Sequence, residues 1–370
     1  ACAGKCMKAG ALCTGSSTLI CVAGSCADGC YVGGMLQAPN STNPDPNFGV
    51  CQKCDTTQSR SAWTNAAAGT TCGTGLACVT GGGCAKVFTK ATGTGTSDLW
   101  DVWGSAANDV WAVGSGTMAL RSVDNGKTWT NTAVIGGAAA TRYAVWGSAA
   151  NNVFVVGSGG TVVQTTNSGM NWTVLPSPAA QTLYGIWGSA GNDIYVVGGG
   201  GTISRSTTGG VTWTGQTSGT TNILRGVWGS GANNVMVVGD GGTLLRSTDS
   251  GATWVKAQTN VTNNLYAIRG VAANDYYAVG ATGTVLRSTD GTTWAKLNFP
   301  DTGYTIYDVW GSAANDVYVS TGITIYATKD SGQTWQRLST SSVPYYYGIW
   351  GSASTDIYAV GSSGNVYHHP

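Results

Sequence analysis

Glutamate is absent from all 370 residues of this chain, and charge of either sign is scarce. Lysine, arginine and aspartate together make up 9% of the residues, whereas a typical soluble domain has about 25% charged residues. The net charge is only +1. This composition excludes a basic surface for nucleic acid, and the weak repulsion between copies favours association.

Other missing features argue against an enzyme and against a membrane span. The two histidines, His368 and His369, lie at the end of the sequence, so a histidine-activated nucleophile is not expected. Glycosidases need a positioned pair of carboxylates, but most aspartates here recur at equivalent turn positions and no carboxylate cluster is evident. No apolar run approaches the roughly 20 residues that cross a bilayer. The sequence therefore predicts a non-enzymatic protein without a membrane-spanning segment.

Cysteine is absent after residue 84, which predicts a domain boundary there. Residues 1–84 have little apolar bulk, so we expect a cysteine-rich, disulfide-stapled arm in an oxidising, extracellular setting. A zinc site is less favoured, because no second pair matches the spacing of Cys51 and Cys54. The number of cysteines is odd, so one is unpaired or intermolecular, and the connectivity stays open. The eleven cysteines are Cys2, Cys6, Cys13, Cys21, Cys26, Cys30, Cys51, Cys54, Cys72, Cys78 and Cys84.

The remainder, residues 85–370, is built from an internal repeat. Its anchor is the tripeptide Trp-Gly-Ser, which recurs at steps of 43, 41, 41, 82 and 40 residues. Ile268-Arg269-Gly270 stands at the midpoint of the long step as a degenerate copy, which makes seven copies. A period near 41 residues indicates a supersecondary unit that is stable only beside its neighbours. The tryptophans are Trp103, Trp146, Trp187, Trp228, Trp310 and Trp350.

Each repeat has the pattern of four short strands. In the third copy, apolar runs at 183–187 and 194–197 are separated by the turn 188–193, a third run follows at 202–206, and Trp213 lies in a fourth. Short β-branched and aromatic runs between Gly, Asn and Asp turns are typical of strands, and no helical period is present. The sequence predicts an all-β fold, a seven-bladed β-propeller of four-stranded blades.

The third turn of several copies carries a second motif, Ser-x-Asp-x-Gly-x-Thr-Trp. It resembles the Asp-box (BNR) repeat of sialidase-like and photosystem-assembly propellers over residues 85–370. The resemblance implies a structural role for the box aspartates, away from any active face. Asn167 and Thr208 replace the aspartate in two copies. The box aspartates are Asp124, Asp249, Asp290 and Asp330. A segment of the cysteine-rich arm resembles a small module of secreted bacterial proteins, which is not catalytic. The resemblance rests on Gly29-Cys30-Tyr31, Asn43-Pro44, Cys51-Gln52-Lys53-Cys54-Asp55, Ser61-Ala62-Trp63-Thr64 and Gly69-Thr70-Thr71-Cys72.

The last copy lacks a fourth strand, since the chain ends soon after the run at 364–368. An open strand edge needs a partner. We expect residues 86–90 to supply it, with Phe88 in place of the box tryptophan, so that both ends of the propeller meet in one blade.

Seven residues lie three positions before the anchors and are candidates for a sugar-stacking surface around a central channel. In a regular strand, residues two positions apart point to the same side, and Trp100 and Tyr143 lie two positions before the apolar Val102 and Val145. Packing between blades is therefore the favoured interpretation. Arg269, in place of an anchor tryptophan, is either a ligand contact or the partner of an aspartate. We expect no metal or cofactor, with calcium at the Asn-Asp turns as an alternative. The seven candidates are Trp100, Tyr143, Tyr184, Arg225, Tyr266, Tyr307 and Tyr347.

Two functions fit this sequence better than a degenerate glycoside hydrolase. The favoured one is a secreted bacterial structural protein that self-associates into an extracellular filament or surface assembly, with the cysteine-rich arm contacting a neighbour. The alternative is a monomeric, lectin-like propeller that binds a glycan or protein, which rests on analogy of fold. The start at Ala1 without methionine fits an exported mature protein.

Overall fold

The computed structural model describes residues 19–22, 25–28, 30–32, 35–37, 52–53, 64–65, 71–73, 76–78, 84–86, 89–91, 94–132, 140–338 and 345–369. The chain divides into two compact units, Ala1–Val87 and Phe88–Pro370. The cysteine side chains, and with them the predicted disulfides, lie outside the described part of the structure.

Short antiparallel strands make up the described backbone of the first unit. They form three two-stranded sheets, β1-β2, β3-β4 and β5-β6, and one three-stranded sheet, β7-β8-β9. Their bounds are β1 Leu19–Val22, β2 Ser25–Asp28, β3 Cys30–Val32, β4 Met35–Gln37, β5 Gln52–Lys53, β6 Thr64–Asn65, β7 Thr71–Gly73, β8 Leu76–Cys78 and β9 Cys84–Lys86.

The second unit is a seven-bladed β-propeller, and each blade is a four-stranded antiparallel sheet. Six blades are continuous in sequence, from β11–β14 (blade 1) to β31–β34 (blade 6). The innermost strands are β11 Leu99–Ala106, β15 Arg142–Ala149, β19 Leu183–Ala190, β23 Leu224–Gly231, β27 Leu265–Ala272, β31 Ile306–Ala313 and β35 Tyr346–Ala353. The second strands are β12 Asp109–Gly114, β16 Asn152–Gly157, β20 Asp193–Gly198, β24 Asn234–Gly239, β28 Asp275–Gly280, β32 Asp316–Thr321 and β36 Asp356–Gly361. The third strands are β13 Ala119–Ser122, β17 Val162–Thr165, β21 Ile203–Ser206, β25 Thr243–Ser247, β29 Thr284–Ser288, β33 Ile325–Thr328 and β37 Val366–His369. The outer strands are β14 Thr130–Asn131, β18 Thr173–Val174, β22 Thr214–Gln216, β26 Val255–Lys256, β30 Ala295–Lys296, β34 Gln336–Leu338 and β10 Thr89–Lys90.

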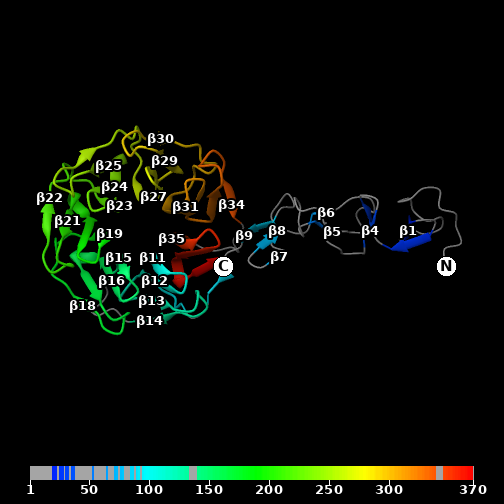
Figure 1. Cartoon of the computed structure of the whole chain (residues 1–370), viewed down its shortest axis with the longest axis horizontal. Coiled ribbons are helices and arrows are strands. Elements are labelled where there is room, and N and C mark those ends of the chain that lie inside the picture. Colours follow the sequence, from blue (N-terminus) through cyan, green and yellow to red (C-terminus); the bar gives the residue numbers. More distant parts are fainter. Residues whose placement is uncertain are drawn as a thin grey trace. The chain divides into compact units, whose positions relative to one another are not determined.

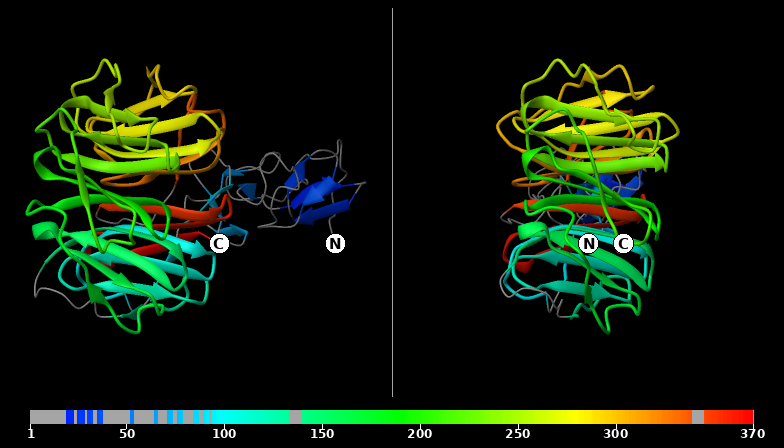
Figure 2. Two further views of the ribbon diagram at one scale, coloured as in Figure 1. Left: turned by 60° about the vertical axis from the view of Figure 1, so that its left-hand side comes forward. Right: turned by 90° about the vertical axis from the view of Figure 1, so that its left-hand side faces the viewer.

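Figure 1 shows these blades around a central axis, with the first strand of each blade innermost. The strands run between the two faces of the ring (Figure 2). Because neighbouring strands are antiparallel, the first strand of each blade begins on the same face of the ring on which the second and fourth strands end. Single-turn 3₁₀ helices join the second and third strands on that face, at η2 Ser158–Gly160, η3 Gly199–Gly201, η4 Asp240–Gly242 and η5 Ser362–Gly364. The Asp-box turns, at the ends of the third strands, lie on the opposite face.

The prediction that an N-terminal strand closes the propeller is confirmed for β10. Thr89 pairs with His368 and Lys90 with Tyr367, so β10 is the outer strand of blade 7. Ala91 N–H extends this ladder by donating to Val366 O at 2.8 Å. Lys86, which was expected in the same strand, pairs instead with Leu76 in the first unit.

Packing between blades explains the Trp-Gly-Ser motif. The indole of one blade lies against the glycine of the same motif in the next blade, and Trp350 of blade 7 lies against Gly104 of blade 1. A Cβ on Gly188 would lie 2.5 Å from Trp146 Cη2, where no side chain fits. Glycine is therefore required at this position because its neighbour's indole already fills the space.

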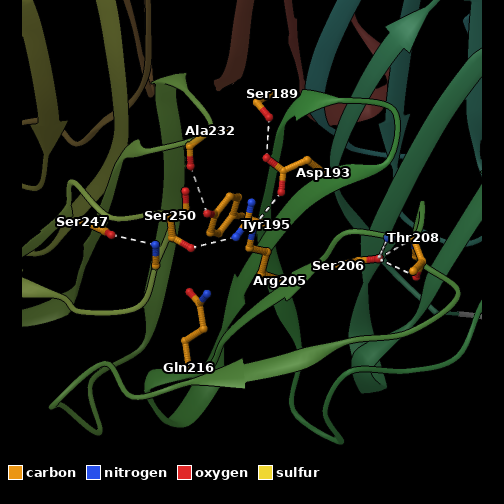
Figure 3. A network of polar contacts seen from close by, with 12 residues as sticks. Ser189, Asp193, Tyr195, Arg205, Ser206, Thr208, Gln216, Ala232, Ser247 and Ser250 are labelled. Atoms are coloured by element: carbon orange, nitrogen blue, oxygen red, sulfur yellow. Dashed lines mark hydrogen bonds and ion pairs between the residues drawn. The ribbon is translucent and has the colours of Figure 1, made fainter.

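A second repeated contact joins the blades on the Asp-box face. Arg205 Nε donates to Asp193 Oδ1 at 2.6 Å, and Arg205 Nη1 donates to Ser250 O of the next blade at 3.1 Å (Figure 3). Ser189 Oγ also donates to Asp193, within the turn that Asp193 ends. The aspartate thus caps its own turn and also orients the arginine that reaches the neighbouring blade.

The Asp-box turns hold their aspartates by local bonds. Asp124 Oδ1 accepts from Ser122 Oγ and from Thr128 N–H, each at 2.9 Å, and Asp124 Oδ2 accepts from Thr128 Oγ1 at 2.6 Å. These bonds lower the pKa of Asp124 to about 2. Asn167 accepts the equivalent backbone bond in blade 2, from Asn171 N–H at 2.9 Å. The box therefore needs a side-chain oxygen at this position, and an amide supplies one as well as a carboxylate.

Candidate functional site at the central cavity

A β-bulge near the start of each innermost strand creates the candidate site. Leu99 pairs with Gly114 and Asp101 with Val113, so Trp100 is the extra residue of the bulge. The same shift in register occurs in all seven blades. The seven extra residues, called here the mouth residues, are Trp100, Tyr143, Tyr184, Arg225, Tyr266, Tyr307 and Tyr347.

The bulges place these side chains along the cavity, where the rings of adjacent blades still contact one another, so contact between blades and a position at the cavity go together. The interpretation that these residues pack between blades assumed that Trp100 and Val102 lie on one side of an unbroken strand. A bulge breaks the alternation of sides and redirects the extra side chain. Val102 is buried, whereas Trp100 is only half-buried, although both line the central cavity. No spacing in the sequence distinguishes a bulged strand from a regular one, so this arrangement was not predictable.

All seven mouth residues and Arg269 line one cavity of about 280 Å³. The lining residues run from the mouth to the anchor positions, three residues further along each strand. At about 3.3 Å per residue these levels are separated by roughly 10 Å. Anchor tryptophans, including Trp146 and Trp187, line the inner part of the cavity. The described structure therefore brings the sequence-predicted ligand residues together in one space.

The mouth is aromatic on one side. Trp100 and Tyr347 stack with ring centroids 4.4 Å apart and an interplanar angle of 24°. Tyr345 lies parallel to Tyr347, at 6.1 Å and 2°, and is 50% exposed. Blades 1 and 7 thus present flat apolar surfaces that solvent can reach.

The opposite side of the mouth, at blade 4, is polar. Arg225 forms a bidentate ion pair with Asp240 of η4, at 2.5 Å for Nε–Oδ1 and 3.0 Å for Nη2–Oδ2. The Arg225 guanidinium also lies 5.5 Å from the Tyr184 ring and 4.9 Å from the Tyr266 ring. These hydrogen bonds to Asp240 raise the pKa of Arg225 in spite of its burial. The Arg225 guanidinium, held in place by Asp240, therefore lines the cavity on the side opposite the stacked aromatics.

Two carboxylates that the sequence analysis missed lie just inside the mouth. Asp101 Oδ1 accepts from Val102 N–H and Oδ2 from Val145 N–H of the next blade, both at 2.8 Å. Asp308 accepts in the same way from Val309 N–H at 2.8 Å and from Ile349 N–H at 2.9 Å. Each aspartate therefore ties its innermost strand to the next one. Both follow a mouth residue directly, but the five other blades have alanine or glycine there, so repetition gave no signal.

The narrow, protein-walled cavity solvates these carboxylates poorly, although both are only half-buried. Burial, with a further contribution from Asp308, raises the pKa of Asp101 to about 7. Burial also raises the pKa of Asp308 to about 6, against the bonds from Ile349 and Val309 N–H. Arg269 lies near both carboxylates, and burial lowers its pKa.

These pKa values predict how stability depends on pH. The folded state holds protons on Asp101 and Asp308 that the unfolded state releases, so their stabilisation is complete below about pH 4 and is lost as the pH rises to about 7. Asp124 has a lowered pKa, so its stabilisation is lost as the pH falls from about 4 to about 2. We expect urea unfolding to show the highest stability near about pH 4 to 5. Asp101→Asn should reduce the pH-dependent loss of stability above this range. Asp124→Asn should reduce the loss of stability below it. An unchanged slope above pH 5 in Asp101→Asn would contradict the assignment.

No group of three or more His, Cys, Asp or Glu side chains in the described residues is placed to hold a metal ion. The turn aspartates considered for calcium are engaged otherwise: Asp109 with Arg121, Asp275 with Arg287, and Asp356 with His368. The part of the chain that the structure describes contains no helix long and apolar enough to cross a membrane.

Comparison with known proteins supports this architecture. The family model of the photosynthesis system II assembly factor YCF48 matches residues 216–289, which span an Asp box and the innermost strand that follows it. The chain contains a BNR-type β-propeller. No curated protein matches the chain.

Solved structures resemble the BNR-type propeller in fold. YCF48 bound to a D1 peptide superposes with a TM-score of 0.65 at 18% identity, covering 76% of this chain and 94% of that one. YCF48 from Cyanidioschyzon merolae has a TM-score of 0.63 at 19% identity, with 76% and 98% covered. The GH74 xyloglucanase from Xanthomonas campestris has a TM-score of 0.61 at 12% identity, with 76% and 53% covered. Identities this low show a shared fold and leave the ligand to be argued from the cavity.

Proposed function

We propose that this protein is a non-enzymatic binding module that holds a carbohydrate at the mouth of its central cavity. The observation that carries the proposal is the set of seven mouth residues, which seven β-bulges turn towards one cavity. Ligand sites are typically concave, mostly apolar and lined by a few precisely placed polar groups. The mouth has this composition.

The geometry suits a pyranose in particular. A sugar ring has an apolar face and a rim of hydroxyl groups. Because Trp100 and Tyr347 cover each other's facing sides, the sugar face would lie on the outward side of this stacked pair, near the exposed Tyr345. The hydroxyl groups would reach Arg225 and Asp240, whose planar groups offer donors and acceptors at fixed positions. Near-absence of unpaired charge at the mouth favours a ligand that binds by stacking and hydrogen bonds.

We propose no catalytic role for the two carboxylates in the cavity. Both oxygens of Asp101 and both of Asp308 accept backbone N–H bonds that tie adjacent blades. A general acid or base must exchange its proton with a substrate, and these groups are committed to holding the strands. The likeness to a xyloglucanase is one of fold and carries no catalysis to this chain.

We expect Trp100→Ala to weaken binding of a complex glycan by about tenfold or more, because it removes one of the two stacked surfaces. The matched control is Tyr304→Ala, since Tyr304 is 39% exposed and does not line the cavity. The ligand is first found on a glycan array, and affinities of the wild type and both variants are then measured by calorimetry.

Three outcomes would count against a carbohydrate site. Equal losses in Trp100→Ala and Tyr304→Ala would show that the mouth is not the site. Binding of peptides but no glycan would assign the mouth to a protein partner, the kind of ligand that YCF48 carries in its complex with a D1 peptide. Size exclusion of the same samples identifies polymers, and a protein that polymerises without binding any glycan would fit a structural subunit instead.

Self-association remains a second candidate because of one feature of the described surface. The outer strands β18 and β26 are two residues long and expose Val174 (55%) and Val255 (67%) on a propeller with few charges to repel a second copy. The other grounds for a filament, the odd cysteine and the arm, lie outside the described side chains. For both candidate functions, we propose that the protein is secreted to the cell exterior.

A further inference from the structure

At the inner end of the cavity, one blade departs from the repeat at its anchor position. Six blades place a tryptophan at the anchor, and its indole lies on the glycine of the next blade. Blade 5 has Arg269 instead, and the space beside Gly311 is filled by Val271, whose Cγ1 would lie 2.6 Å from a Cβ there. Arg269 is therefore not needed to pack the junction between blades 5 and 6. Its side chain lines the cavity.

The Arg269 guanidinium has charged neighbours but no direct partner among the described residues. No ion pair within 4 Å or hydrogen bond joins it to Asp308 or Asp101, although both act on it electrostatically. Their oxygens are used by backbone N–H groups of the inner strands. The five N–H donors of the Arg269 guanidinium thus lie beside a solvent-accessible cavity, and no carboxylate of the described residues accepts a hydrogen bond from them.

The charge around Arg269 changes with pH. When Asp101 and Asp308 are protonated, Arg269 is the only unpaired charge among the described residues that line the inner cavity; when both are ionised, the three groups sum to one negative charge. Burial raises the pKa values of the two carboxyls to about 7 and about 6, so this reversal falls near neutrality. Arg225 is already paired with Asp240. The other titratable residues that line the cavity are Tyr143, Tyr184, Tyr266, Tyr307 and Tyr347, which are uncharged in this range.

We propose that Arg269 binds the carboxylate of an acidic sugar and that protonation of Asp101 and Asp308 controls this binding, so that the ligand is held in acid and released at neutral pH. The inference rests on the proposed function, because the mouth would hold the pyranose while Arg269 receives its carboxylate. A guanidinium is well matched to a carboxylate, since two parallel N–H bonds are available. A sugar carboxylate is still ionised at about pH 5, when the two aspartates are largely neutral.

The test compares two ligands that differ only in charge, methyl β-glucuronide and methyl β-glucoside. Trp146, Trp187 and other indoles line the cavity, so binding is followed by tryptophan fluorescence at about pH 5 and about pH 8. We expect the glucuronide to bind about tenfold more tightly at the lower pH, and the glucoside to bind equally at both. Acetate is added as a competitor, to separate recognition of the carboxylate alone from recognition of the acidic sugar.

Two variants test the residues. Arg269→Gln should abolish the preference for glucuronide over glucoside at low pH. Asp308→Asn should preserve glucuronide binding at about pH 8, because it removes one of the opposing charges without removing Arg269. Circular dichroism confirms that both variants are folded, and the wild-type comparison of the two ligands stands without them.

The outcomes separate this inference from the proposed function. Binding of the glucoside with no preference for glucuronide at either pH would overturn the role of Arg269 and leave the carbohydrate site intact. A glucuronide preference that does not change with pH would overturn the control by Asp101 and Asp308. Failure of both sugars to bind would overturn the inference, and the glycan array then decides the carbohydrate site independently.

Discussion

Gly188→Ala is expected to destabilise the propeller by about 1–3 kcal/mol, although it adds a single methyl group. The new Cβ would lie 2.5 Å from Trp146 Cη2 and 2.8 Å from the backbone oxygen of Asp193. Trp146 has little room to retreat because it stacks on Phe154, with ring centroids 6.0 Å apart. The free energy of unfolding in urea measures the effect.

The control is Gly215→Ala in the outer strand β22. A Cβ on Gly215 meets nothing within 4 Å, so we expect no loss and a gain of up to about 1 kcal/mol from lower chain entropy. Combining Gly188→Ala with Trp146→Leu should cost less than the sum of the two single changes, because the smaller side chain makes room for the methyl group. Strict additivity would show that the indole is not the obstacle.

Removing residues 366–370 is expected to abolish cooperative unfolding of the propeller. Strand β37 lies between β36 and β10, and its residues Val366, Tyr367, His368 and His369 are at most 9% exposed. Without it, blade 7 loses its third strand and β10 loses its only partner. We expect circular dichroism to show a broad, low-temperature transition in place of a sharp one.

A graded version of this test changes one hydrogen bond. Ala91→Pro removes the N–H that donates to Val366 O at 2.8 Å, and Ala257→Pro removes the equivalent bond to Leu244 O at 2.9 Å in blade 4. Ala91→Pro should be the more destabilising of the two, because β10 is joined to its blade by this short ladder and not by a turn. Equal effects would argue that closure adds nothing beyond an ordinary outer strand.

The sequence predicted the propeller because its signals are local and recur. The anchor glycine, the box aspartate and the turn before the second strand each satisfy a contact within one blade or with the next, so seven copies repeat the same evidence. Substitutions of the turn aspartate keep this side-chain contact, with Arg246 still the partner of Asn234 in blade 4. Where Asn152 replaces the turn aspartate, its partner is Gln164, at 2.8 Å, in place of an arginine.

The cavity was harder to predict because it depends on departures from the repeat. The bulge at Trp100 leaves no trace in residue spacing, and it alone decides whether the side chain meets the core or the cavity. Asp101 and Asp308 are five blades apart in sequence and interact electrostatically only because the ring closes. Arg269 was recognisable as an exception, but its neighbours were not.

The Trp-on-Gly contact has a direction, since six of the seven blades offer an indole on the side where the next blade presents its anchor glycine. All junctions of this kind share one pair of surfaces, so a copy gained or lost by duplication of its coding segment would still find a fitting neighbour on each side. The number of blades is then set by the angle at which these surfaces meet and not by any blade's individual identity. Blade 5, with Arg269 and Val271, is the exception: its outgoing surface differs, which fixes its place in the order and gives an otherwise interchangeable series a reference point.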